Sequence, residues 1–173
     1  RNMKIFVAVG THEQGFDRLN KLIREINVDK HQVVIQQGSN TKIIFPKEME
    51  VHDFFSQEEM EDVTKWSDIM ISQASPGLIM LAWRNSSISI SMPRKSILNE
   101  AVDNHQFDFA EFVCDLGATS IIDENSNLNL IFGKLYSEKN RILNSQFAAL
   151  QLFQRKQEQV GESVQKLITN LIN

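Results

Sequence analysis

Three clusters of polar and small residues follow predicted strands, each at the point where a strand ends. The clusters are Gly10–Gln14, Gln73–Gly77 and Pro93–Gln106. Because the carboxyl ends of parallel strands meet at one edge of a sheet, we expect the three clusters to lie together and to form a ligand site. Neither a cysteine and histidine spacing of the zinc kind nor a Walker lysine occurs, so no metal is expected.

The first cluster leaves its strand through one glycine in "VAVGTHEQGFDRL" (Val7 to Leu19). Thr11 and His12 form a compact polar turn before an amphipathic helix. His12 can titrate near neutral pH or donate a hydrogen bond to a phosphate. A plain turn with no ligand is the alternative interpretation.

The second cluster lies in "ISQASPGLIM" (Ile71 to Met80). Its small residues allow a ligand close to the backbone, and the helix that follows presents unpaired amides and a favourable dipole to an anion. A diphosphate fits these properties. A simple turn with Ser75 as the helix cap and Pro76 in the first turn explains the same residues.

The third cluster, "MPRKSILNEAVDNHQFDF" (Met92 to Phe109), is rich in charged and amide side chains. Asn104 and Gln106 carry paired donors and acceptors of the kind that bind sugar hydroxyls. Arg94, forked and always charged, is the best candidate to neutralise a diphosphate. Helix capping by Asn104 is the competing explanation for part of this segment.

The composition indicates an ordinary globular domain. The chain has 173 residues, 42% of them hydrophobic, and a net charge of −4 that disfavours a nucleic-acid partner. Its single cysteine, Cys114, is expected to be buried, and a reducing cytoplasm suits a chain without disulfides. No apolar run reaches the length of a membrane span or a signal peptide.

Alternating strands and helices predict an α/β fold with a doubly wound, mainly parallel, Rossmann-like sheet. The strands are expected at Lys4–Val9, Gln32–Gln37, Lys42–Phe45, Glu50–Phe54, Asp68–Ser72, Ser87–Met92 and Thr119–Asp123. Ser56-Gln-Glu-Glu59 predicts a capping box, and Gly117 the end of a helix over 104–116. We expect residues 3–125 to bind the ligand, and 126–173 to form a helical extension packed on the same domain.

Four segments occur in a fixed order along the chain: "VGTHEQGFDRL", "VVIQQGS", "SPGLIMLA" and "MPRKSILNEAVDNHQFDFA". Together they resemble the soluble donor-binding subunit of bacterial two-component polysaccharide glycosyltransferases, of the capsule or exopolysaccharide galactosyltransferase type. Those subunits are similar to the C-terminal half of family 28 enzymes with the GT-B fold. The likeness covers about residues 3–123.

The resemblance implies a nucleotide-sugar site at the three clusters. The nucleotide and its diphosphate would lie against Gly10, Thr11, Ser75, Pro76, Gly77 and Arg94. The donor sugar would lie near Glu100, Asn104, His105 and Gln106. His12 is assigned as the catalytic base, although a partner subunit could supply that base instead.

The implied function is transfer of a hexose, with UDP-galactose a frequent donor, onto a lipid-linked polysaccharide repeat unit. The UDP-sugar is a substrate and no cofactor is expected. A GT-B active site lies between two α/β halves, so the chain is expected to be inactive alone and to need a membrane-anchored subunit that binds the acceptor. That partner would hold the chain at the inner face of the membrane. Assembly of the chain into a homo-oligomer is a further alternative.

Two departures from the family pattern bear on activity. The family usually has His-Gly-Gly where this chain has Gln73-Ala74-Ser75, and Leu81 stands where relatives place an acid that binds ribose. A leucine accepts no hydrogen bond. The alternative function is therefore a non-catalytic subunit that stabilises or activates a catalytic partner.

Overall fold

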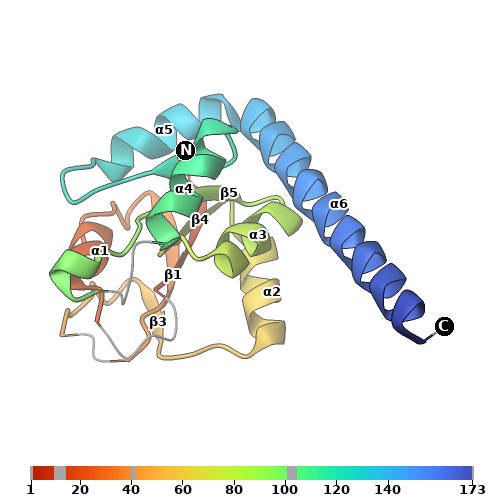
Figure 1. Cartoon of the computed structure of the whole chain (residues 1–173). Coiled ribbons are helices and arrows are strands. Elements are labelled where there is room, and N and C mark those ends of the chain that lie inside the picture. Colours follow the sequence, from red (N-terminus) through yellow and green to blue (C-terminus); the bar gives the residue numbers. More distant parts are fainter. Residues whose placement is uncertain (1, 10–14, 40–41, 101–104, 173) are drawn as a thin grey trace.

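The computed structural model describes residues 2–9, 15–39, 42–100 and 105–172 (Figure 1). The strands are β1 (Met3–Ala8), β2 (His31–Gln36), β3 (Glu50–His52), β4 (Ile69–Ser72), β5 (Ile88–Ser91) and β6 (Ser120–Ile121). The helices are α1 (Asp17–Ile23), α2 (Gln57–Trp66), α3 (Pro76–Arg84), the 3-10 turn η1 (Ser96–Leu98), α4 (His105–Asp115), α5 (Leu128–Ser137) and α6 (Lys139–Ile172).

The six strands form one parallel sheet in the order β3-β2-β1-β4-β5-β6. The order grows outward in both directions from the pair β1 and β4, so the chain is doubly wound. The predicted α/β fold class is confirmed. In such a sheet the crevice for a ligand lies beyond the carboxyl ends of the two strands where the order reverses.

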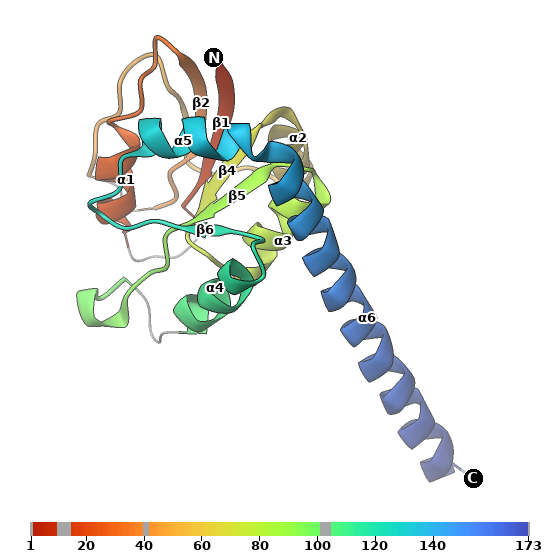
Figure 2. The same cartoon turned by 90° about the horizontal axis from the view of Figure 1, so that it is seen from above.

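Helices flank the sheet (Figure 2), and alternation along the strands sends side chains to both of its faces. Ile5 and Val7 pack with α1 and α5 on one face, in a cluster that includes Leu19 and Phe132. Phe6 packs on the other face with α2 and α3. Burial on both faces explains why β1, β4 and β5 are almost continuously apolar or small in sequence.

Local signals for helix ends are confirmed where they depend on short-range chemistry. The Ser56 hydroxyl accepts a hydrogen bond from the Glu59 amide, and the Glu59 carboxylate accepts one from the Ser56 amide. These two bonds complete the predicted capping box. Pro76 opens α3, and Gly117 follows α4 with a φ of +71°. That left-handed conformation is one that glycine adopts without strain.

Three expected strands differ from the structure, and one of them, over 119–123, is shortened to β6. Residues 42–45 form no strand, and the side chain of Ile44 is 83% exposed. The expected strand over residues 50–54 is shortened to β3. β3 pairs with Val34–Gln36 and thereby takes the open edge of β2. No edge remains at that place for the preceding segment.

Helix α6 packs on the domain only through its first half. Buried Gln146 donates to the Ser87 carbonyl and accepts from the Ser89 amide, both at 2.8 Å, and Phe153 contacts Trp83. Residues 154–166 are exposed, and the helix projects beyond the domain in both views. In the structure α5 and the start of α6 pack on the domain, whereas residues 154–166 are exposed. Among the described helices, including this one of 34 residues, none is apolar enough over sufficient length to cross a bilayer.

Helix α4 buries a narrower face than its sequence predicts. Ala110 and Val113 are buried, while Phe112 and Leu116 are 47% and 39% exposed. Cys114, expected in the core, is only partly buried. The reason is geometric, because α4 covers the short edge strand β6 and only a thin stripe of the helix reaches the sheet.

Candidate functional site

The strand register brings the carboxyl ends of β1, β4 and β5, which precede the three polar clusters in sequence, to one edge of the sheet. Ala8 of β1 pairs with Ser72 of β4, and Ser72 pairs with Ser91 of β5. The segments after these residues therefore leave neighbouring strands at the same level. We call this the carboxyl edge, and it includes the point between β1 and β4 where the strand order reverses.

The turn between β4 and α3 has an unusual backbone. Ala74 is fully buried and has a φ of +70°, a left-handed conformation that costs a non-glycine residue about 1 kcal/mol or more. The Ser72 hydroxyl accepts a 3.4 Å hydrogen bond from the Ala74 amide. The turn thus keeps a conformation suited to glycine, although the sequence has alanine where the family usually has glycine.

The start of α3 is open to ligands. Ser75 caps the helix by accepting a hydrogen bond from the Leu78 amide, while Pro76 and Gly77 are exposed. A Cβ built on Gly77 has no atom within 4 Å. Unpaired amides and the positive end of the helix dipole at this position can bind an anion such as a phosphate.

Arg94 lies beneath the carboxyl edge rather than in solvent. Its side chain is 1% exposed and donates hydrogen bonds to the carbonyls of Val9 at 3.0 Å and Glu100 at 3.1 Å, and to the side chain of Gln73. Its guanidinium carbon lies 4.6 Å from the centre of the Phe16 ring. Burial lowers the pKa of Arg94 to about 10, partly offset by the charge of Glu100, so it stays protonated at neutral pH.

This placement differs from the expected role of Arg94. Its described bonds go to the protein itself, so direct contact with a diphosphate is not favoured by the geometry. A buried cation close to the turn before α3 still raises the potential at that helix start.

Glu100, expected near the donor sugar, is held by an ion pair. Its oxygens accept hydrogen bonds from Arg18 Nε at 3.1 Å and Nη2 at 2.9 Å, and from the Lys95 amide at 3.0 Å. The residue is 7% exposed. Burial lowers the pKa of Arg18, but Glu100 and then Glu124 more than offset this, so the pKa is raised overall.

The start of α4 presents the two remaining described candidates. His105 is exposed, whereas Gln106 is partly buried. Gln106 Oε1 is buried, and no donor among the described residues lies within hydrogen-bonding distance of it. A buried acceptor without a donor is costly, which makes this amide a candidate to bind a hydroxyl of a ligand.

Four expected site residues cannot be located. Gly10, Thr11, His12 and Asn104 lie outside the described residues. Their described neighbours Gly15 and Glu100 lie at the carboxyl edge, since both carbonyls accept hydrogen bonds from Arg94. Within the described ranges no cluster of three histidine, cysteine or acidic side chains is arranged to hold a metal ion.

Sequence reasoning missed the residues that hold the site together. Arg18 lies on α1 and reaches Glu100, the Pro93 carbonyl and Glu124. No local pattern marks it, because its partners are 75 to 106 positions away in sequence. The only signal was an arginine at the second position of an otherwise amphipathic helix.

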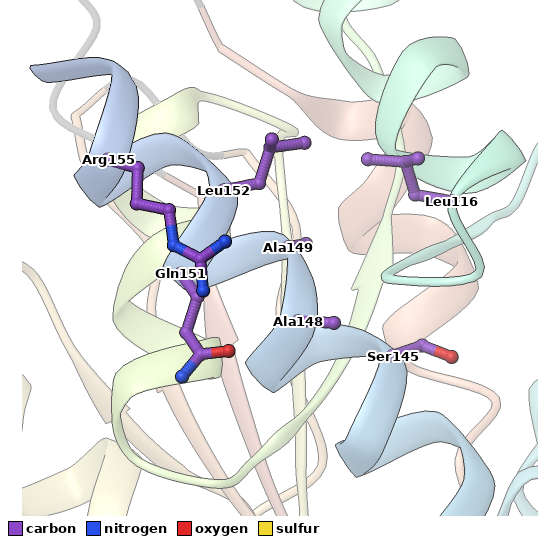
Figure 3. Close-up of a pocket in the computed structure, with 7 residues that line it drawn as sticks. All are labelled: Leu116, Ser145, Ala148, Ala149, Gln151, Leu152 and Arg155. Atoms are coloured by element: carbon purple, nitrogen blue, oxygen red, sulfur yellow. The ribbon is translucent and has the colours of Figure 1, made fainter. Parts of the chain in front are cut away.

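A separate groove of about 440 Å³ lies between α4 and α6 (Figure 3). Its lining consists of Leu116, Ser145, Ala148, Ala149, Gln151, Leu152 and Arg155. None of these is a candidate residue, and the groove is lined from the end of α4 rather than from its start. We therefore place the candidate site at the carboxyl edge and not in this groove.

Solved structures with the same fold are glycosyltransferases. The "glycotransferase of kitacinnamycin" matches with a TM-score of 0.66 and 16% identity over 86% of this chain and 38% of that chain. Acinetobacter baumannii MurG matches with a TM-score of 0.59 and 19% identity, over 87% of this chain and 46% of that chain. Os79 from O. sativa, solved in complex with UDP, matches with a TM-score of 0.65 and 12% identity, over 86% of this chain and 35% of that chain. This chain spans less than half of each, so its fold is that of one half of a GT-B glycosyltransferase.

The family model for the glycosyltransferase family 28 C-terminal domain matches residues 4–171. The chain belongs to this family. No curated protein matched the sequence. The match covers nearly the whole chain, including α6, and confirms the coarse part of the resemblance seen in the sequence.

Proposed function

We propose that this domain binds the nucleotide-sugar donor of a glycosyl transfer and that the nucleotide is UDP. The observation that carries the proposal is the open start of α3 beside the switch point of the sheet, with Gly77 exposed and unobstructed. The family and the UDP complex of a protein with the same fold support the choice of ligand.

The leaving group of such a transfer is a nucleoside diphosphate. Its growing negative charge would be stabilised by the backbone N–H groups of Ser75 and Gly77 and by the helix dipole, with the field of buried Arg94 behind them. Gly10 and Thr11 would lie against the nucleotide. His12 is our candidate for the base that takes a proton from the acceptor hydroxyl, unless the partner supplies it.

Donor-sugar recognition would fall to the start of α4. The unsatisfied Oε1 of Gln106 offers an acceptor for a sugar hydroxyl, and Asn104 and His105 lie beside it in sequence. Glu100 contributes by holding the preceding loop. No cofactor and no metal is part of the proposal.

The finer assignment follows the resemblance to two-component polysaccharide enzymes. We infer that the donor is a UDP-hexose such as UDP-galactose and that the acceptor is a lipid-linked polysaccharide repeat unit. A membrane-anchored subunit would bind that acceptor and hold this chain at the cytoplasmic face. Two of the matched solved structures are more than twice as long as this chain, which supports the need for a second half.

A non-catalytic subunit is the second candidate function. Leu81 is 6% exposed and packs on Phe6 and Met70, so position 81 offers nothing to a ribose. A domain that kept the fold but lost the donor would still be able to stabilise a catalytic partner. Nucleotide binding separates the two functions.

The test compares two glycine substitutions in a titration with UDP. Gly77→Ala adds a methyl that points toward the start of α3, while Gly133→Ala adds one on α5, and neither meets an atom within 4 Å. We expect UDP to bind the wild type with micromolar to millimolar affinity, Gly77→Ala to weaken binding by about tenfold or more, and Gly133→Ala to leave it unchanged. Absence of binding at millimolar UDP would favour the non-catalytic subunit.

A further inference from the structure

Arg94 donates hydrogen bonds to residues within or next to each of the three candidate segments. Arg94 donates to the carbonyl of Gly15, which follows the first segment, at 3.4 Å. It donates to the Glu100 carbonyl, just before residues 101–106, and to Gln73 in the turn before α3. One buried guanidinium thus links all three segments.

Arg18 and Glu100 extend this link to the neighbouring elements. The paired Arg18 and Glu100 side chains join α1 to the loop after β5, and Arg18 also donates to the Pro93 carbonyl at 2.8 Å. The guanidinium carbons of Arg94 and Arg18 lie 4.6 Å and 5.4 Å, respectively, from the centre of the Phe16 ring, which is fully buried. We call Arg18, Glu100 and Arg94 the arginine clamp.

The three side chains of the arginine clamp are largely buried. Arg94 is 1% exposed, Glu100 7%, and the Arg18 side chain 11%. The Glu100 carboxylate already accepts three hydrogen bonds from Arg18 and the Lys95 amide. Groups so occupied and so buried are suited to fixing loops, and poorly suited to contacting a ligand.

We propose that the arginine clamp is a positioning device: it sets the distance between the nucleotide end and the sugar end of the site, and none of its three side chains touches the donor. The inference rests on the proposed function of the carboxyl edge. It reassigns Glu100 from a sugar contact to a residue that acts through the loops it joins. Weakening the clamp then shifts all three segments together.

Binding measurements test the reassignment of Glu100. Glu100→Gln keeps the shape of the side chain but removes the charge, and Arg94→Lys keeps the charge but removes the fork. We expect each to weaken UDP and a UDP-hexose by the same factor, about tenfold to a hundredfold. The control Arg84→Met breaks the exposed pair of Arg84 with Glu61 and leaves both affinities unchanged. Loss of UDP-hexose binding alone in Glu100→Gln would overturn the proposal.

Hydrogen exchange tests the clamp without any ligand. In Arg94→Lys and Glu100→Gln we expect the amides of residues 15–16 and 95–100 to exchange at least about tenfold faster than in the wild type, while amides of β1 and β4 keep their rates. Unchanged exchange in these loops would overturn the clamp even if UDP binds. Faster exchange in a protein that binds no UDP would support the clamp and refute the proposed function instead.

Discussion

At the residue scale, Ala74 shows how a substitution can keep a local shape. The residue stands where the family usually has glycine, yet its φ of +70° is that of a glycine. Its buried methyl group packs with Ile79 and Trp83, which offsets part of the strain. The sequence departure therefore changes the side chains of this turn more than its backbone path.

Residue roles were predictable where they depend on nearby atoms. The cap at Ser75 and the proline in the first turn of α3 follow from contacts within three residues. The occupied state of Arg94 did not, because its acceptor Val9 is 85 positions away. A sequence shows that an arginine is present, whereas only the fold shows whether its guanidinium is available.

Gln106 gives a prediction at this scale. Gln106→Ala removes a buried oxygen that lacks a donor, so the ligand-free protein should lose no stability. A UDP-hexose should bind more weakly by about 1–3 kcal/mol, the cost of leaving its hydroxyl unpaired, and UDP should bind as before. Calorimetry with both ligands measures this, with exposed Gln151→Ala as the control. Equal losses for UDP and UDP-hexose would contradict a role in sugar recognition.

At the scale of elements, periodicity and end signals predicted most strands and helices. The runs that became β1, β4 and β5 are apolar or small on both faces, which suits central parallel strands. The failure at residues 42–45 has a non-local cause, since β3 takes the edge of β2. Pairing partners are fixed by the whole sheet, and a short apolar run carries no record of them.

The joint between β1 and β2 gives a pH-dependent prediction. His31 Nδ1 accepts a hydrogen bond from the Met3 amide at 3.3 Å, and the ring contacts Phe132 edge-on. Burial, together with nearby positive charges including Lys30, lowers the pKa of His31 below its ordinary 6.5. Because the unfolded chain then binds more protons, stability is full above pH 6.5 and falls as the pH drops through the folded pKa.

Urea unfolding between pH 7 and pH 5.5 measures this effect. The wild type should lose stability across that range, and His31→Gln, which retains an acceptor but cannot titrate, should lose less. His52→Gln is the control, because His52 is a partly exposed histidine on the edge strand β3. An unchanged pH dependence in His31→Gln would show that other groups control it.

At the scale of the whole molecule, the sheet order is what creates the site. Ala8 and Ser72, at the carboxyl ends of β1 and β4, lie side by side although they are far apart in sequence, because the two strands are neighbours at the switch point. The α/β class was predictable from alternation, and the meeting of strand ends followed from the class. The clamp was not predictable because its partners are far apart in sequence, and the projecting half of α6 was not predictable because it depends on where packing stops.

The exposed part of α6 predicts how the domain responds to truncation. Residues 154–166 are exposed, whereas Phe153 contacts Trp83, Phe109 and Phe112. Ending the chain after Phe153 should change the free energy of unfolding by less than about 1 kcal/mol, since a free helix end is marginal in water. Phe153→Ala in the full chain should cost about 2 kcal/mol or more. Thermal unfolding compares the two, and a large loss from truncation alone would contradict this division of α6.

The domain accounts for one half of a GT-B enzyme, and this decides what the chain does alone. Under the proposed function the donor lies on the carboxyl edge, and a second half that completes the cleft binds the acceptor. We expect the purified chain to bind UDP-hexose without transferring it, and to transfer hexose to a lipid-linked acceptor only with membranes that contain an acceptor-binding subunit. Radiolabelled UDP-hexose follows the transfer, and Gly77→Ala in the same mixture controls for the donor site. Sustained turnover by the isolated chain would contradict the two-component mechanism, because the base and the acceptor site would then both lie within this domain.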